Sequence, residues 1–459
     1  MKYETIIIGA GLSGLAAGIR LAYFDKRVAI LERHTTIGGL NSFYRLRGRN
    51  YDVGLHAVTN YAPPGSNKGP LSKLLRQLRL SWEDFALCEQ NESAVDFLST
   101  RLTFTNDIRF LEQQIREAFP GQIDGFVRLS RMIEQHDGTN LNRQPASGRK
   151  VVGEYISDSM LIDMLFCPLL FYGSATPHDM DFHQFAILFN SIFREGFARP
   201  EKGVRPILKA LTRKFRENGG ELKLRAGVKK ILTHQGKAVG VELESGEILE
   251  ADNVLSSAGL VETLRMTEGA ERLAELERPG EISFVETIFT LDCLPGELGH
   301  DQTVVFYNES PDFHYQPPQL PVDTRSGIIC SPNNFQYQKQ REAGTIRITA
   351  LADPKPWMTW PEDEYARQKQ FWTEKIVESA LRVMPDFRGH IIETDAFTPR
   401  TIKKYTGHLN GAVYGAPGKK IDGRTPIENL YLSGTDQGFL GIIGAMLSGI
   451  SIANAYLLN

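Results

Sequence analysis

The sequence has little cysteine and almost no excess of charge, and both shortages exclude classes of protein. Its four cysteines, Cys88, Cys167, Cys293 and Cys330, are scattered through 459 residues without a CxxC pair or a histidine-rich neighbour. This spacing argues against a zinc site, and disulfide frameworks are typical of small secreted domains. Lys and Arg number 52 against 55 Asp and Glu, so a net charge of −3 offers no basic surface to nucleic acid. We therefore expect no metal, no nucleic-acid partner and a cytoplasmic location.

One long stretch without charge closes the chain. Residues 439–458 include no charged side chain, and these twenty residues are enough for a helix to cross a bilayer. A strand-like segment, Asp436 and glycines at 438, 441 and 444 precede or begin the stretch, and a membrane anchor needs none of them. Apolarity on all sides is also typical of a helix buried between two layers. We predict a buried helix whose N-terminus the protein uses.

The other end of the chain carries a nucleotide-binding pattern. Gly9, Gly11 and Gly14 form a G-x-G-x-x-G turn after the apolar run 5–8, and a second predicted strand ends at Glu32. Such glycines let the backbone approach a pyrophosphate, and the following helix offers free N–H groups and the positive end of its dipole. The acid at position 32 has the spacing of one that hydrogen-bonds a ribose hydroxyl, and it argues against NADP.

The sequence lacks a second G-x-G-x-x-G, which argues against a separate NAD(P)H domain. A glycine pair, Gly38-Gly39, follows the acid instead, and "YDVGLHAV" occupies residues 51–58. "TPRTIKKYTGHLNGAVYG" at 398–415 and "LYLSGTDQGFLGIIGAMLSG" at 430–449 complete the pattern. Together these motifs resemble the phytoene desaturase, carotenoid isomerase and retinol saturase group of FAD enzymes, within the amine-oxidase-like flavoprotein superfamily.

The resemblance implies an α/β fold in which a Rossmann-type, two-dinucleotide-fold FAD-binding domain carries an inserted mixed α+β substrate domain. We expect the FAD-binding domain at residues 1–65, 200–270 and 395–459, and the substrate-binding domain at residues 66–199 and 271–394. The spacing of apolar residues predicts mostly helix over 66–200, further helices near 204–217 and 362–383, and strands within 283–294, 303–308 and 344–352.

The family's cofactor contacts can be carried over to this sequence position by position, with FAD as the implied cofactor. A late strand is expected to deliver Asp436 to the ribityl chain. The helix after it would point its N-terminus at the flavin pyrimidine ring and stabilise negative charge there. The implied FAD contacts are Gly9, Gly11, Leu12, Ser13, Gly14, Glu32, Arg33, Gly38, Gly39, Leu40, His56, Val228, Ser257, Ala258, Gly434, Asp436, Gly441, Ile442 and Ile443.

Few charged groups are expected near the flavin ring, because allylic hydride exchange needs positioning and desolvation more than a strong base. The candidate catalytic residues are His56, Arg400, Tyr405 and Tyr414, with Thr398 as a further polar neighbour. His56 either transfers a proton or makes a structural hydrogen bond under the isoalloxazine, and the sequence leaves both open. The two tyrosines fit the wall of an apolar tunnel, and Arg400 is expected to pair with a carboxylate.

The resemblance implies an oxidoreductase that acts on C–C or C=C bonds of a hydrophobic polyisoprenoid, such as a carotenoid or retinoid. Desaturation, saturation and cis/trans isomerisation stay open, as do oxygen, a quinone or a reductase as electron acceptor. Two alternatives are an amine or porphyrinogen oxidase on the same scaffold and a non-catalytic prenyl-binding protein of the escort type. An amine oxidase would need an aromatic cage, and Phe439 has no paired aromatic beside it in the sequence.

A substrate of this kind would be taken from the bilayer, so we expect peripheral association with the inner face of the membrane. Segment 155–199 is the candidate docking surface, because it is apolar and rich in aromatic residues. Phe182, Phe185, Phe189 and Phe193 recur in it at helical spacing and would enter the membrane interface.

Overall fold

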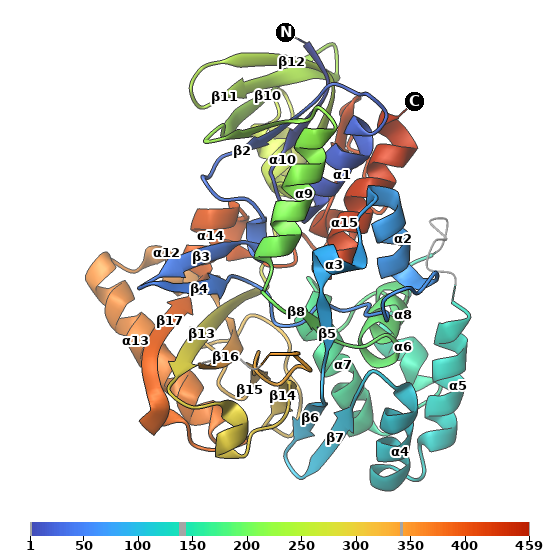
Figure 1. Cartoon of the computed structure of the whole chain (residues 1–459), viewed down its shortest axis with the longest axis vertical. Coiled ribbons are helices and arrows are strands. Elements are labelled where there is room, and N and C mark those ends of the chain that lie inside the picture. Colours follow the sequence, from blue (N-terminus) through green and yellow to red (C-terminus); the bar gives the residue numbers. More distant parts are fainter. Residues whose placement is uncertain (1, 137–143, 340–342, 459) are drawn as a thin grey trace.

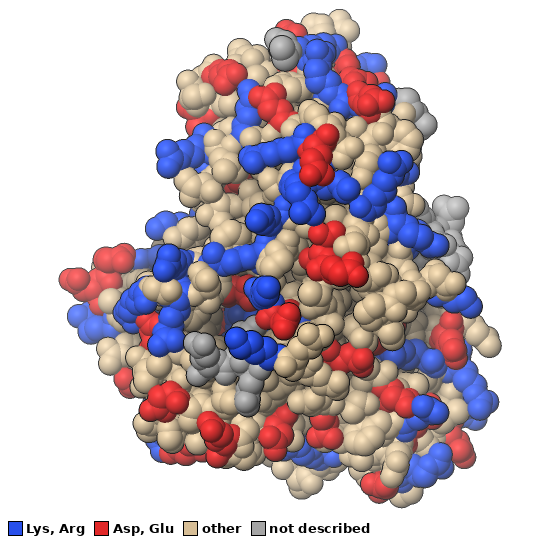
Figure 2. Space-filling model, viewed as in Figure 1, with Lys and Arg blue, Asp and Glu red and all other residues tan. Residues whose placement is uncertain are grey.

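The computed structural model describes residues 2–136, 144–339 and 343–458. Their main elements are two seven-stranded β-sheets with helices packed around them (Figure 1). The N- and C-terminal ends both lie in the upper part of this view, near the first sheet. On the face shown in Figure 2, positive and negative side chains are interspersed, so this face presents no large patch of one sign.

The first sheet has the parallel centre of a dinucleotide-binding fold. Its order is β10-β11-β12-β1-β2-β9, and β18 pairs with β12. The β9–β2, β2–β1, β1–β12 and β12–β18 pairings are parallel, whereas β10–β11 and β11–β12 are antiparallel. Its strands are β1 (Lys2–Ile8), β2 (Val28–Glu32), β9 (Glu221–Leu224), β10 (Val228–His234), β11 (Lys237–Leu243), β12 (Ile248–Ser256) and β18 (Leu430–Leu432).

Three helices share one apolar core with β1 and β2: α1 (Leu12–Ala22), α9 (Arg205–Glu217) and α15 (Gly441–Ile452). Ile6, Ile7 and Ile8 at the end of β1 are all buried, as expected of a parallel strand that is covered on both faces. The carboxyl ends of these strands form the edge of the sheet at which such folds bind their ligands.

Helix α15 is the charge-free segment at the end of the sequence, and it is buried as predicted. A Cβ atom at Gly449 would lie 2.0 Å from the carbonyl oxygen of Ser13, so the backbones of α15 and α1 are in direct contact. Ile442, Ile443 and Met446 of α15 are buried. In the part of the chain that the structure describes, no helix is long and apolar enough to cross a membrane.

The second sheet combines strands from both insertions. Its order is β17-β13-β16-β15-β14-β6-β7, in which only β14–β6 is a parallel pairing. Because β6 and β14 are about two hundred residues apart in the sequence, this pairing joins the two insertions into one body. Its strands are β6 (Ser93–Phe97), β7 (Thr100–Phe104), β13 (Ser283–Leu291), β14 (Val304–Asn308), β15 (Ser326–Cys330), β16 (Gly344–Ala352) and β17 (Ile391–Phe397).

Each face of the second sheet has its own core. Helix α13 (Glu362–Ala380) covers one face with Trp372 and Ile376. Helices α4 (Ile108–Ala118), α5 (Ile123–Glu134), α7 (Ser159–Gly173) and α8 (Phe182–Phe189) contribute to the core on the other face. The helices predicted near 204–217 and 362–383 and the three predicted strand segments are therefore present.

The segment 66–200 differs from the prediction in two ways. It is not mostly helical throughout, because β5 (Leu87–Glu89), β6 and β7 interrupt the helices. In addition, α2 (Gly69–Leu78) and α3 (Trp82–Phe85) contribute buried residues to the core of the first sheet, although we expected them in the substrate domain. The leucines of α2 recur at helical spacing, and this pattern does not specify which core they join.

The structure corrects the expected docking surface. The apolar run in segment 155–199 forms α7, whose side chains from Met164 to Phe171 are all buried. The phenylalanines of α8 and the residues after it are buried as well, and Ile187 is the only large exposed hydrophobic side chain among the described residues of this segment. Its apolar residues are therefore used for packing, and few of them face solvent.

Candidate functional site

The turn between β1 and α1 has the tight geometry that its glycines predict. Gly9 has a φ of +95°, in the region that side-chain-bearing residues rarely adopt. A Cβ atom there would lie 2.5 Å from Oγ of Ser257, which donates a hydrogen bond to the carbonyl oxygen of Ile8 at 2.8 Å. A Cβ atom at Gly14 would lie 2.2 Å from the carbonyl oxygen of Gly9. Strand β12 and α1 thus close around the turn.

The outer side of the same turn is open. A Cβ atom at Gly11 would meet no atom of the described chain within 4 Å, and one at Gly39 would meet only Cα of Gly11, at 3.7 Å. Helix α1 begins after Gly11 with no acidic residue in its first turn and no side-chain cap from the described residues. Free N–H groups beside open space fit the pyrophosphate of a dinucleotide. Leu12 and Ser13, in the first turn of α1, are buried beneath this opening.

Glu32 is fixed at the carboxyl end of β2, beside the turn. Its carboxylate accepts hydrogen bonds from the backbone N–H of Ala10 and of His34, both at 2.9 Å. The neighbouring Arg33 points toward α14 (Pro399–Thr406), where it donates to the carbonyl oxygen of Lys404 at 3.1 Å. The acid thus lies at the predicted nucleotide site, while the guanidinium of Arg33 joins two segments of the protein.

Replacing Glu32 tests its expected bond to the ribose. Glu32→Gln preserves the size of the side chain and is expected to weaken FAD binding by about 1–3 kcal/mol, because it removes the charge from a partly desolvated hydrogen bond. The measurement is the dissociation constant of FAD, titrated into apoprotein. Glu247→Gln, a change to an exposed acid, is the control. Unchanged FAD affinity in Glu32→Gln would remove this residue from the cofactor site.

Other predicted FAD contacts approach the N-terminus of α1 from the far parts of the chain. Ser257 and Ala258 directly follow β12, and Val228 begins β10. A Cβ atom at Gly434 would lie 3.2 Å from Oγ of Ser13, which places the loop after β18 against α1. Leu40 lies in the short turn of helix at Gly39–Asn41. Ser257, Gly434 and Gly39 lie against the turn or the start of α1, Val228 lies in an edge strand of the same sheet, and the contacts of all these positions with FAD stay predictions.

Asp436 is buried and already engaged by the backbone. Its carboxylate accepts hydrogen bonds from the N–H of Leu260 at 2.5 Å and of Ala416 at 2.8 Å, and it lies 3.5 Å from Nζ of Lys419. It thereby joins α10 (Leu260–Met266) and the loop after α14 to the segment that precedes α15. These structural contacts of Asp436 were not predicted. A hydrogen bond to the ribityl chain of FAD would be made in addition to them.

The N-terminus of α15 meets the end of α7 and the loop after β4 (Arg49–Asp52). Leu440 precedes α15, and a Cβ atom at Gly173 would lie 2.5 Å from its Cδ1. On the other side, a Cβ atom at Gly441 would lie 3.5 Å from Oγ1 of Thr59. The first turn of α15, with Ile442 and Ile443, has no acidic residue and no side-chain cap from the described part of the chain. We call the place where α15 meets the end of α7 and the loop after β4 the junction. The dipole of α15 favours a partial negative charge there.

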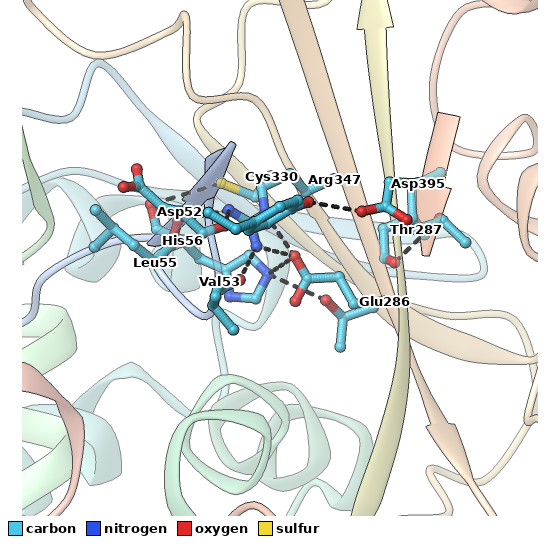
Figure 3. Close-up of polar contacts among 12 residues, drawn as sticks. Asp52, Val53, Leu55, His56, Glu286, Thr287, Cys330, Arg347 and Asp395 are labelled. Atoms are coloured by element: carbon cyan, nitrogen blue, oxygen red, sulfur yellow. Dashed lines mark hydrogen bonds and ion pairs between the residues drawn. The ribbon is translucent and has the colours of Figure 1, made fainter. Parts of the chain in front are cut away.

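His56 lies at the boundary between the two sheets, because Leu55 and Val58 beside it belong to the core of the first sheet and its imidazole contacts the second sheet. Figure 3 shows its polar contacts. Its Nε2 atom is 3.1 Å from Oγ1 of Thr349 and 3.6 Å from Oε1 of Glu286, which belong to the neighbouring strands β16 and β13. Its own carbonyl oxygen accepts hydrogen bonds from Arg199 at 2.8 Å and from Sγ of Cys330 at 3.7 Å. The imidazole is thus held by the second sheet, while its backbone belongs to the loop after β4.

Two buried arginines hold this loop by its carbonyl groups. Arg347 forms an ion pair with Glu286 and donates to the carbonyl oxygens of Asp52, Val53 and Leu55 (Figure 3). Arg199 pairs with the Asp52 carboxylate at 2.7 Å and also reaches Leu55. Burial is the largest single influence on the pKa of Arg347 and lowers it, but Glu286, Cys330 and Asp52 together outweigh burial, so the pKa is raised. The guanidinium of Arg347 therefore stays charged at neutral pH.

This environment makes a positive charge on His56 unfavourable. Burial, followed by the charges of Arg347 and Arg199, holds the pKa of His56 well below its ordinary value. The imidazole is therefore neutral at pH 7, and it can accept or donate one hydrogen bond at each ring nitrogen. Of the two interpretations that the sequence left open, these surroundings favour the structural hydrogen bond.

A second buried histidine predicts sensitivity to acid. Burial first, and then Arg101, lower the pKa of His300 to about 4. Below about pH 6.5 the unfolded chain binds a proton at His300, and the folded chain does not. The stability that the folded protein has with neutral His300 is therefore complete above about pH 6.5 and is lost as the pH falls toward 4. Between pH 7 and pH 5 the free energy of unfolding should fall by about 2 kcal/mol from His300.

The test is urea unfolding at pH 7 and pH 5. His300→Leu should reduce the pH dependence by about the same amount, whereas His234→Gln, at an exposed position, should leave it unchanged. An equal pH dependence in wild type and His300→Leu would show that His300 is not the group that titrates.

The remaining candidate catalytic residues lie in three different surroundings. Tyr414 is at the junction: its hydroxyl donates to the carbonyl oxygen of Phe171, and its ring contacts Phe284 with centroids 5.9 Å apart. Arg400 pairs with Glu362 at 3.1 Å, as expected of it, and its guanidinium covers the ring of Tyr365, away from His56. Tyr405 is 56% exposed, so it does not form the wall of a tunnel. Thr398 caps α14 by accepting from the N–H of Thr401.

Asp292, Cys293 and His390 form a separate group whose potential metal-ligand atoms lie within 4.8 Å of one another in the described chain. The Asp292 carboxylate is 2.8 Å from Nδ1 of His390. The sequence did not indicate this group, because His390 is remote from the other two residues in the chain. It lies at the surface, where an aspartate–histidine pair accounts for the contact without an ion.

The fold and the glycine turn define a class of protein, and comparison with known families agrees. The chain belongs to the family described as flavin containing amine oxidoreductase, whose model matches residues 12–265. It is therefore an FAD-dependent oxidoreductase of the amine oxidase superfamily, with FAD implied by the family and compatible with the open turn at Gly11.

Individual relatives cover nearly the whole chain. An all-trans-retinol 13,14-reductase from Danio rerio is 24% identical over 99% of this chain and 86% of its own length. A 4,4′-diaponeurosporene oxygenase from Staphylococcus aureus is 26% identical over 95% of this chain and 94% of its own length.

Solved structures share the fold. An oxidoreductase from Methanosarcina mazei has a TM-score of 0.69 at 17% identity, covering 99% of this chain and 100% of its own. Putrescine oxidase bound to putrescine has a TM-score of 0.64 at 15% identity, covering 99% and 98%. The predicted α/β fold with a Rossmann-type FAD-binding domain is confirmed by these matches.

Proposed function

We propose that this protein exchanges a hydride between FAD and a carbon–carbon bond of a hydrophobic polyisoprenoid. The observation that carries the proposal is a cluster of aromatic side chains near the end of α7, which contacts Leu440 at the start of α15. Phe171 and Phe284 lie 6.0 Å apart between ring centroids, and Tyr414 adds a third ring against Phe284. A long apolar chain can be bound there through burial alone.

The relatives support the same substrate class. The names of two of them refer to a retinol and to a carotenoid, and both relatives align with nearly the whole of this chain. At 24% and 26% identity these relatives support a class of substrate. The experiment below distinguishes desaturation, saturation and isomerisation.

The residues of this chain would bind, orient and desolvate the reacting bond. FAD, when bound, would accept or donate two electrons in the form of a hydride. The N-terminus of α15 would stabilise negative charge on any group bound at the junction in front of it. His56 would hold its neutral imidazole in place through Thr349, and the aromatic side chains would exclude water from the reacting carbon atoms.

Anaerobic flavin absorbance in liposomes tests the proposal. Oxidised holoenzyme is mixed with phytoene, photoreduced holoenzyme with a conjugated carotene, and a third sample of oxidised holoenzyme with putrescine. Bleaching by phytoene would identify a desaturase, reoxidation by the carotene a saturase, and a changed cis/trans pattern without a flavin signal an isomerase. Bleaching by putrescine alone would instead identify an amine oxidase, and silence in all arms would overturn the polyisoprenoid proposal.

A further inference from the structure

Two buried polar atoms near this aromatic cluster have no hydrogen-bond partner among the described residues. They are Oη of Tyr172, near the end of α7, and Nε of Arg199, in β8 (Ala198–Pro200). The two residues lie near each other, because Phe197, two positions before Arg199, stacks on the Tyr172 ring at 5.2 Å. Burial raises the pKa of the Tyr172 hydroxyl, and Arg199 is close enough for its charge to oppose that rise.

Both atoms adjoin the proposed active site. Gly173, next to Tyr172, contacts Leu440 at the start of α15, and the preceding Phe171 accepts the hydrogen bond of Tyr414. Arg199 donates to the carbonyl oxygen of His56 and is also one of the residues that line a cleft of about 340 Å³. Arg199 therefore adjoins the cleft, and Tyr172 adjoins the junction at α15.

Their chemistry specifies what would bind. An arginine Nε–H can only donate, and a tyrosine hydroxyl can donate as well, so an acceptor oxygen is the complementary group for each of them. The charge of Arg199 is already balanced by Asp52 at 2.7 Å, which favours a neutral acceptor over an anion. Around the hydroxyl the side chains are aromatic: Tyr172 contacts Phe197 and Phe306. The ligand is thus apolar apart from one carbonyl oxygen.

We propose that Tyr172 and Arg199 form a subsite for a carbonyl oxygen of the substrate. This inference rests on the proposed function and narrows it: the preferred substrate is an oxygenated polyisoprenoid, and Tyr172 determines specificity for the oxygenated end. A buried hydroxyl without a partner is unfavourable in the free protein, and a carbonyl supplied by the substrate removes that cost. A pure hydrocarbon would leave both donors unpaired.

The experiment compares two ligands with one carbon skeleton: 4,4′-diaponeurosporene and its terminal aldehyde. Their apparent dissociation constants are measured for the FAD-loaded protein by quenching of tryptophan fluorescence at fixed detergent concentration. Tyr172→Phe removes only the hydroxyl and keeps the aromatic ring. Tyr155→Phe, at a partly buried tyrosine of the same core, is the matched control.

Wild type and Tyr155→Phe are expected to bind the aldehyde more tightly than the hydrocarbon. Tyr172→Phe should weaken aldehyde binding about 5-fold and leave hydrocarbon binding unchanged. Equal effects on both ligands would assign Tyr172 a packing role and overturn the subsite, and so would an unchanged preference for the aldehyde. If phytoene or a carotene still changes the flavin spectrum in those cases, the proposed function stands without the subsite. If wild type binds neither ligand, both proposals are overturned.

Discussion

Valine at position 11 is expected to yield a folded protein that is purified without FAD. The Cβ atom that it adds would enter open space in the structure, so the variant should fold. That space is where the pyrophosphate would approach the N–H groups of α1, and a branched side chain would fill it. We expect FAD occupancy, measured from the ratio of absorbance at 450 and 280 nm, to fall at least about 10-fold, which corresponds to roughly 1.4 kcal/mol or more of binding free energy.

Gly121→Val is the matched control for this variant. A Cβ atom at Gly121 also meets no atom of the described chain within 4 Å, and this glycine is exposed on the other body of the protein. It should retain FAD at the wild-type level. If Gly11→Val retains FAD as well, the pyrophosphate does not lie at this turn, and the binding mode inferred from the glycine pattern would be wrong.

The second large effect is expected from Arg347. Its guanidinium is buried, pairs with Glu286 and holds three carbonyl oxygens of the loop that presents His56. Arg347→Met would leave the Glu286 carboxylate buried without its partner, which typically costs about 3–5 kcal/mol. Urea unfolding should therefore show a loss of that size in the apparent free energy of unfolding.

Two further variants separate the ion pair from the loss of a large side chain. Glu286→Leu combined with Arg347→Met removes both charges, so it should recover part of the stability lost in Arg347→Met alone. Arg49→Met breaks a half-exposed pair with Glu393 at 3.4 Å and should cost at most about 1 kcal/mol. A loss as small as this in Arg347→Met would show that the arginine is not an essential part of the boundary between the sheets.

The sequence predicted best those parts of the site that are encoded within a few residues. The turn at Gly9 and Gly11, the acid at Glu32 and the helix α15 each have a local pattern, because the backbone geometry that they form is itself local. The structure places these elements as expected. Their contacts with FAD are a separate question, which the substitutions at Gly11 and Glu32 address.

The parts that could not be predicted depend on contacts between distant segments. Arg347 and Glu286 each interrupt an apolar strand, and this was a usable signal of a buried charge. In the β13–β16 register Glu286 lies opposite Thr349, and Arg347 lies opposite Ile288, so the two charges are diagonal neighbours. That register and the approach of the loop at His56 follow from tertiary packing, which the pattern of one strand does not contain.

The same limit explains the other differences. Tyr405 is exposed and Arg400 pairs at the surface, although both are in a motif that resembles the family's active-site region. Helix α2 has a clear apolar face, but nothing in its spacing indicates that this face packs with the core of the first sheet. The division into two domains stays a proposal. The packing of α2 and α3 with the core of the first sheet argues against a boundary at residue 66.

The contact between α1 and α15 also determines when the cofactor can be acquired. Strand β18 and helix α15 come from residues 430–452, yet they complete the wall around a turn made by residues 9–14. During synthesis the nucleotide turn is therefore made first and stays without its neighbours until more than four hundred further residues have been added. FAD is thus expected to be bound after translation, and its arrival would stabilise the late packing of residues 430–452 against the turn at residues 9–14.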